Sequence, residues 1–279
     1  MATHNQVRVI GYLLKDPKII NEGVEGMEKI LFQMRTTRRD IEGYNEDKFA
    51  DLIVFYDGTE LMNKMKNFKK FDIVDIKGVF NILPVNKKSV CTVCGSENIK
   101  YNGSSTFVYP IYVTRHGSYI DYFNEKGESP DALLEKNYKE VSNQCLIIGT
   151  VVTEPELMTY KKKSCCRYGL GVDRKYYIGT QDDITADYPW VYSYGAQAEL
   201  DHEKLVKEKS LILVDGFIHN KQIKVKCTCE NCGSNYTHND VGTQFTPYSV
   251  EYLSDYITDE ELAMAEEDAK RRKIHEDLS

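Results

Sequence analysis

The chain repeats itself after 138 residues, and this repeat constrains the fold more than any other feature of the sequence. Asn5–Gly11 (NQVRVIG) returns as Asn143–Gly149 (NQCLIIG) at that offset. The matching pairs further along are Gly78 with Gly216, Cys91–Ser96 with Cys229–Ser234, and Phe107 with Phe245. A period this long indicates two copies of one domain rather than a solenoid, whose repeats span about 20 to 50 residues. We therefore expect two domains with one plan and almost no net insertion.

Length and composition agree with two globular domains. The 279 residues are 41% apolar and 28% charged, which is ordinary for a globular protein. We expect a first domain at residues 1–114, a linker at 115–142, a second domain at 143–257 and an acidic helical tail at 258–279. An apolar run of about 18 residues and a secretory signal pattern are both missing from the sequence. The expected location is therefore the cytoplasm, without a membrane partner.

Apolar alternation predicts the same five strands in each copy. In the first copy they are 7–14, 30–35, 52–56, 73–79 and 107–114. In the second they are 146–152, 166–172, 190–194, 210–218 and 245–252. A helix is expected between the third and fourth strands, at 59–68 and 198–206, and a short one in the linker after Ser129. The predicted fold class is all-β with short helices, as two tandem five-stranded OB-fold barrels.

The net charge of −7 is unevenly distributed along the chain. Residues 258–279 hold eight acidic and four basic side chains, and so carry more than half of that negative charge. The basic residues elsewhere gather in clusters, and local clustering governs anion binding more than the total charge does. The clusters are Arg35/Arg38/Arg39, Lys64/Lys66/Lys69/Lys70, Lys161/Lys162/Lys163 and Lys221/Lys224/Lys226.

Three segments resemble the bacterial and phage single-stranded DNA-binding protein family. Asn5–Pro17 is similar to the family's opening strand and turn, Tyr188–Gly195 to its third strand, and Leu205–Gly216 to its helix end and fourth strand. The resemblance covers both copies. It implies the tandem OB-fold form, in which a homodimer supplies four barrels. It also implies base-stacking aromatics at Tyr188 and Tyr194, with a further stacking position at Tyr176 or Tyr177.

The aromatic row Tyr188, Trp190, Tyr192 and Tyr194 supports DNA binding without reference to any family. Residues two apart in a strand share a face, and unpaired bases stack on exposed rings with about 1–3 kcal/mol per base, whatever the sequence. The alternative is that part of the row belongs to the barrel core. We expect at least two of the four rings to be exposed.

The first copy is expected to bind differently. Its matching row is Ala50, Leu52, Val54 and Tyr56, which retains only Tyr56 as an aromatic. Guanidinium groups contact phosphates and stack on bases, so Arg35, Arg38 and Arg39 are candidate contacts. In the second copy Arg174 and the loop lysines Lys161, Lys162 and Lys163 are added. We predict stacking mainly in the second barrel and phosphate contacts in both.

The cysteine pairs indicate a structural metal site. Each copy has a Cys-x-x-Cys-Gly-Ser turn, a spacing that lets two thiolates face one Zn²⁺. A closed site needs four ligands, and two arrangements are open. Cys91, Cys94, Cys229 and Cys232 could share one ion, or Cys227, Cys229, Cys232 and His238 could form a local site. We favour the shared site because both copies retain the pair. Unmetallated thiols are the remaining alternative.

The favoured function is sequence-nonspecific binding of single-stranded DNA during replication, recombination or repair. No phosphate-binding glycine loop or catalytic triad order is present, so we do not expect an enzyme. The alternatives are an RNA-binding or replication-accessory protein on the same fold, and a zinc-stapled protein-interaction adaptor. The family's aromatic tail tip has no counterpart in Arg271–Ser279, which puts recruitment of replication or recombination proteins by that route in doubt.

Overall fold

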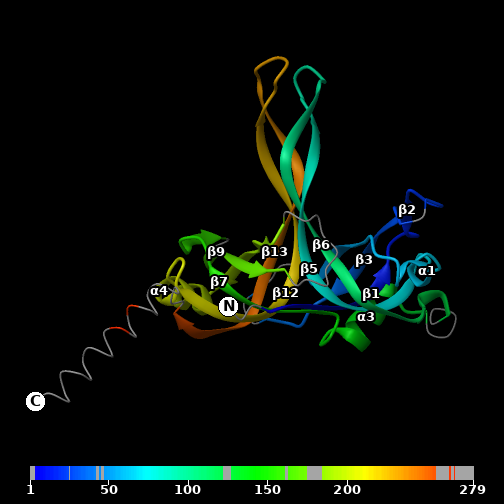
Figure 1. Cartoon of the computed structure of the whole chain (residues 1–279), viewed down its shortest axis with the longest axis horizontal. Coiled ribbons are helices and arrows are strands. Elements are labelled where there is room, and N and C mark those ends of the chain that lie inside the picture. Colours follow the sequence, from blue (N-terminus) through cyan, green and yellow to red (C-terminus); the bar gives the residue numbers. More distant parts are fainter. Residues whose placement is uncertain are drawn as a thin grey trace, which may run out of the picture.

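The structure of the chain is a computed structural model that describes residues 4–24, 26–41, 44, 47–121, 127–160, 163–174, 184–255, 264 and 267. Two barrels lie side by side, and a pair of long hairpins projects from between them (Figure 1). Almost all of the tail predicted at 258–279 lies outside the described residues, where only Met264 and Glu267 are placed, both helical. Among the described residues, no helix is long and apolar enough to cross a membrane.

The first barrel follows the predicted strand plan. Its strands are β1 (His4–Leu13), β2 (Lys18–Ile20), β3 (Lys29–Thr37), β4 (Phe49–Tyr56), β5 (Asp72–Val90) and β6 (Glu97–Ser118), with α1 (Met62–Met65) between β4 and β5. It closes through β1 against β3 and through a parallel contact of β4 with β6 at Val54 and Val108. The OB-fold prediction is confirmed, and the short β2 is an addition that the sequence reasoning missed.

The second barrel repeats this plan. Its elements are β7 (Asn143–Val151), β8 (Glu156–Tyr160), β9 (Lys163–Asp173), β10 (Ala186–Asp187), β11 (Trp190–Tyr194), α4 (Ala196–Lys204), β12 (Ser210–Thr228) and β13 (Asn235–Asp255). It closes through β7 against β9, and through β11 against β13 at Val191 and Phe245. The predicted strand 190–194 coincides with β11.

The two barrels join through antiparallel pairing of β1 with β7. Val7 lies opposite Cys145, its own partner in the 138-residue repeat. The repeat is therefore expressed as an internal twofold relation centred on that pair. The repeated asparagines have one role in both copies, because Asn5 bonds both backbone groups of Phe80, and Asn143 those of Ile218.

The repeated glycines are explained by close approach of the last strand. A Cβ on Gly78 would lie 2.1 Å from the carbonyl oxygen of Tyr109, and one on Gly216 would lie 2.3 Å from that of Thr246. The strand register shifts at each of these glycines. Any side chain at either position would therefore clash with backbone.

The long hairpins are the largest departure from the predicted fold. We name Phe80–Thr106 the first arm and Ile218–Gln244 the second arm; Figure 1 shows them projecting together from the barrels. The predicted strands stopped at Val79 and Ile218 because the residues beyond them are mostly polar. One register shift, between Val85 and Lys87, occurs only in the first arm. The structural counterpart of Phe245 is therefore Val108, and the sequence match of Phe107 with Phe245 is wrong by one residue.

The linker helix predicted after Ser129 is α3 (Pro130–Tyr138). The Ser129 hydroxyl accepts a hydrogen bond from the backbone N–H of Ala132, and Pro130 occupies the first turn, as the sequence predicted. Leu133 and Leu134 of α3 pack on Ile10 and Ile73 of the first barrel. The linker is thus docked on the outer face of that barrel.

Candidate nucleic-acid interface and metal centre

Alternation along β11 turns its aromatic row outward. Val191 and Ser193 are buried, whereas Trp190 is 40% exposed and the preceding Tyr188 is 59% exposed. The expectation that at least two rings of the row are exposed is therefore met. The part of the row that could have formed the core, Tyr192 and Tyr194, is half-buried.

The row assigned to the first barrel is wrong. Ala50, Leu52, Val54 and Tyr56 are all buried, and the Tyr56 hydroxyl accepts a hydrogen bond from the backbone N–H of Leu61. The first barrel closes at the pair Val54 and Val108, and the second closes at the pair Val191 and Phe245. Val54 is therefore the structural counterpart of Val191. The match between the two rows was therefore wrong by one residue, and a shift of one residue exchanges the two faces of a strand.

With the register corrected, the outward row of β4 is Asp51, Ile53 and Phe55. Phe55 packs against Phe107 with ring centroids 5.6 Å apart, and the Lys29 ammonium lies 5.9 Å from the Phe55 ring. These residues, with Leu31 and Leu83, line a mostly apolar pocket of about 280 Å³. This surface was not predicted from the sequence, although Asp51, Ile53 and Phe55 alternate along one face of the strand.

A central groove of about 370 Å³ connects the two barrels. Tyr188, Trp190 and Tyr192 line one side. Ile53 and residues of both arms line the rest; the arm residues include Ile82, Lys87, Ile223, Val241 and Gln244. The exposed rings of β11 therefore border a groove that both copies build.

Arg167 of β9 supports the edge of this groove. Its guanidinium lies 4.6 Å from the Trp190 ring centroid and 2.8 Å from a carboxylate oxygen of Glu156. Tyr194 does not line the groove: its ring lies 5.0 Å from that of Tyr44, and its hydroxyl accepts a hydrogen bond from the Lys221 ammonium. Tyr194 therefore packs beside the groove, and the stacking role proposed for it has no support in its position.

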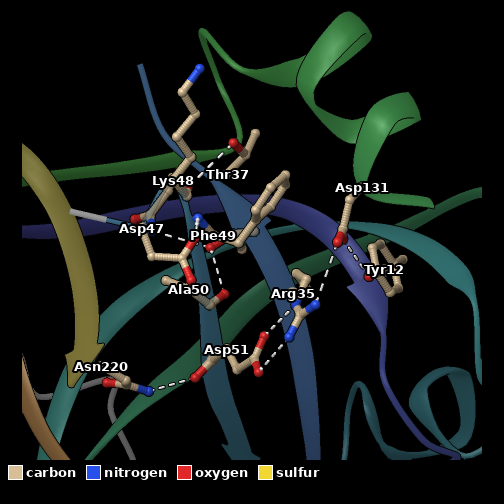
Figure 2. Close-up of polar contacts among 12 residues, drawn as sticks. Tyr12, Arg35, Thr37, Asp47, Lys48, Phe49, Ala50, Asp51, Asp131 and Asn220 are labelled. Atoms are coloured by element: carbon tan, nitrogen blue, oxygen red, sulfur yellow. Dashed lines mark hydrogen bonds and ion pairs between the residues drawn. The ribbon is translucent and has the colours of Figure 1, made fainter. Parts of the chain in front are cut away.

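Arg35 is engaged within the protein (Figure 2). Its guanidinium makes two hydrogen bonds to the Asp51 carboxylate, at 2.7 and 3.0 Å, and lies 3.5 Å from the Asp131 carboxylate of α3. Asp131 also accepts a hydrogen bond from the Tyr12 hydroxyl. These ion pairs raise the pKa of Arg35. The predicted phosphate contact is instead a link among β3, β4 and the linker helix.

Arg38 and Arg39 are also committed to internal contacts. Arg38 is buried, with its guanidinium 4.6 Å from the Tyr44 ring and 5.3 Å from that of Phe217. Arg39 lies 4.0 Å from the Tyr248 ring and pairs with Asp215 at 3.3 Å. The phosphate contact predicted for Arg38 is wrong, because a buried guanidinium cannot reach the phosphates of a nucleic acid on the surface. Arg39, half-exposed, fixes the first copy to the second.

The nucleic-acid contact predicted for Arg174 is also wrong. Its side chain is 3% exposed and makes a bidentate ion pair with Asp187, with contacts of 2.6 and 2.9 Å. It also donates to the carbonyl oxygen of Ile82 in the first arm. Among the remaining candidates, Lys161, Lys162, Tyr176 and Tyr177 lie outside the described residues. Lys163 opens β9, half-exposed, opposite Tyr160.

The four cysteines of the two turns meet at the ends of the arms. All four sulfur atoms lie within 4.8 Å of one another; Cys91 is 3.8 Å from Cys232, and Cys94 is 3.6 Å from Cys229. Four thiolates about 2.3 Å from a tetrahedral Zn²⁺ would be about 3.8 Å apart, so the arrangement fits such an ion. Among the residues described, neither Cys227 nor His238 joins the cluster. The structure thus selects the shared arrangement over the local one.

The two cysteine turns share one backbone conformation. Gly95 and Gly233 have positive φ angles of 74° and 68°, and their N–H groups bond the carbonyl oxygens of Cys91 and Cys229. Hydrogen bonds from Ser96 are the main cause that lowers the pKa of Cys94 to about 6. A thiol that ionises readily is suited to metal ligation.

The fold has counterparts among solved structures. Two are crystal structures of the single-stranded DNA binding protein from Thermus aquaticus, one wild-type and one a deletion mutant with a further substitution. Both align with a TM-score of 0.60 over 92% of this chain, and over 97% and 98% of theirs, at 14% sequence identity. These proteins share one fold. No protein-family model matches the chain, and no curated protein matches it either. The resemblance found in the sequence is confirmed at the level of the fold.

Proposed function

We propose that the protein binds single-stranded DNA without regard to sequence by stacking unpaired bases on Tyr188 and Trp190. The observation that carries the proposal is that both rings are exposed at the edge of a groove lined by polar and apolar side chains of both copies. Exposed rings that border a groove are suited to ligand contact, and every base offers a flat face to them. The shared fold with a single-stranded DNA binding protein supports the same conclusion.

The phosphate contacts are reassigned. Arg35, Arg38 and Arg174 are held by internal partners, so we propose Lys224 and Lys226, exposed on the second arm, together with Lys163. Lys161, Lys162, Tyr176 and Tyr177 remain candidates from the sequence. The stacking surface would continue from the groove to Phe55 and Phe107 on the first barrel, because Ile53 and Phe55 are neighbours on one face of β4.

The wider proposal follows from this activity and assigns no catalytic step to the chain. The protein would coat and protect single strands during replication, recombination or repair in the cytoplasm, where thiols stay reduced. Zn²⁺ would be the structural ion of the four-cysteine cluster. A homodimer would supply four barrels, and replication or recombination proteins would be its partners.

Titration with oligo-dT tests the proposal. We expect deep quenching of Trp190, the chain's only tryptophan, because a stacked base contacts its ring. The slope of log affinity against log salt concentration is negative, and each neutralised phosphate should make it steeper by about 0.7. A duplex of the same length should bind far more weakly. Tighter binding of oligo-U would favour the RNA alternative. Unchanged Trp190 emission with no binding would favour the protein adaptor and refute the proposal.

Phe55→Ala tests the extension onto the first barrel. If a base stacks there, the affinity for a long oligo-dT should fall by about 5- to 150-fold, while a short oligonucleotide that fills only the central groove should bind as before. Ile111→Ala is the matched control, because Ile111 is exposed on β6 but lines neither the groove nor the pocket. Equal affinities of Phe55→Ala and the control for long strands would confine stacking to the groove.

A further inference from the structure

The two arms depend on each other for their order. A two-stranded hairpin is at best marginally stable alone in water, and each arm projects from its barrel as such a hairpin. Contacts between the arms begin at the cysteines. The Asn98 amide donates to the sulfur of Cys229 at 3.6 Å, and its oxygen accepts from the backbone N–H of Glu230 at 2.9 Å. The tips are therefore held against each other by side chains of both copies.

Further contacts continue from the tips toward the barrels. The hydroxyls of Ser89 and Tyr236 lie 2.7 Å apart, and the Lys87 ammonium lies 2.7 Å from the Asp240 carboxylate. Lys87 and Asp240 both line the central groove. A series of cross-arm contacts thus leads from the four cysteines to the walls of the groove that holds Tyr188 and Trp190.

We propose that a metal ion held by Cys91, Cys94, Cys229 and Cys232 sets the position of the groove walls, so that affinity for single-stranded DNA depends on metal occupancy. We call this four-cysteine site the metal clasp. The inference rests on the proposed function, since it assigns a control to the same groove. It goes beyond a structural role for the ion, because it couples two separate sites.

With its ion bound, the metal clasp is the strongest link between the arms. The Ser89–Tyr236 and Asn98–Cys229 hydrogen bonds are buried, and the Lys87 and Asp240 side chains are 18% and 20% exposed. Contacts of these kinds each add only a modest net stability, because folding gains them in exchange for contacts with water. Metal–thiolate ligation instead contributes its binding free energy directly to the order of the segment that carries it. Without the ion the arms can separate, and the apolar walls formed by Ile82 and Ile223 lose their fixed spacing across the groove.

The test uses the double variant Cys94→Ser with Cys232→Ser, which removes one exposed ligand from each arm. We expect about one zinc per chain in the wild type and none in the variant, measured by elemental analysis, which also distinguishes zinc from iron. Affinity for oligo-dT should fall by about 5- to 150-fold, the usual range for two coupled sites. Acrylamide quenching of Trp190 without DNA should increase as the groove opens.

Cys227→Ser is the matched control, because Cys227 lies on the second arm outside the clasp. It should keep both metal and affinity. Stripping the wild type with a chelator should reproduce the double variant, and added Zn²⁺ should restore binding, which separates metal loss from misfolding.

The outcomes separate the two proposals. Loss of metal with unchanged affinity and unchanged Trp190 quenching would overturn the coupling and leave the proposed function intact. A wild type that holds zinc but does not bind oligo-dT would overturn the proposed function, and with it the coupling to DNA. A wild type that holds no metal and gains none from added Zn²⁺ would overturn the clasp itself.

Discussion

Replacing both exposed rings of the groove, with Tyr188→Ala and Trp190→Ala together, should weaken oligo-dT binding by at least about 30-fold. Each ring is expected to contribute about 1–3 kcal/mol of stacking free energy per base. Since the two rings border one groove, their contributions are coupled and need not add. The loss is best measured by anisotropy of a labelled oligo-dT, because the variant has no tryptophan. The melting temperature should change less than on truncation of a core ring, because Tyr188 is 59% and Trp190 40% exposed.

Tyr112→Ala provides the control for this result. Tyr112 is 52% exposed and has two ammonium groups near its ring, Lys64 at 5.5 Å and Lys77 at 5.9 Å, yet it does not line the groove. It resembles a base-stacking site in every respect except position. If the double variant binds as the Tyr112 variant does, the groove is not the site of stacking, and the proposed function loses its main support.

The sequence was sufficient where a signal repeats in both copies. The offset between Asn5 and Asn143 predicted two equivalent barrels, and the paired cysteine turns predicted one shared site. Duplication helps because each copy is an independent test of the same pattern. The same reasoning failed at Tyr56, since the offset is not constant along the chain. A shift of one residue made the buried row that ends at Tyr56 look outward-facing, and Phe55 was therefore not predicted.

The arginines failed for a different reason. Whether a guanidinium is free for phosphate depends on carboxylates that are remote in sequence. Arg35 finds Asp51 across a strand pair and Asp131 on the linker helix, and neither partner is marked by local spacing. Arg174 pairs with Asp187 within the second barrel, and both side chains also bond the backbone of Ile82 in the first arm. Clusters of basic residues therefore overstate the positive surface of a chain whose copies are tied together by ion pairs.

The arms show what local pattern cannot predict. Their residues alternate weakly and include polar and charged side chains on both faces, so neither strand looks buried in the sequence. They are ordered by pairing within each hairpin and by contacts such as Lys87 with Asp240 between the hairpins. An arm that is ordered by its contacts with the other arm has no clear strand pattern in its own sequence.

Arg174→Ala should destabilise the protein by about 3–5 kcal/mol, the usual cost of breaking a buried ion pair. The side chains of Arg174 and Asp187 are 3% and 1% exposed, so the substitution leaves a carboxylate without its cation away from water. The pair also holds the first arm, because Asp187 accepts from the backbone N–H of Ile82 and Arg174 donates to its carbonyl oxygen. The free energy of unfolding in urea would measure the loss.

Two comparisons show whether this cost comes from the buried charge. Arg167→Ala removes an ion pair whose members are 34% and 54% exposed, and it should cost under about 1 kcal/mol because solvent screens such pairs. Arg174→Met combined with Asp187→Leu removes both buried charges, and it should cost less than Arg174→Ala alone. If the double substitution were the more destabilising, the hydrogen bonds to Ile82 would outweigh the ion pair. The attachment of the first arm to the second barrel would then depend on the hydrogen bonds to the Ile82 backbone rather than on the ion pair.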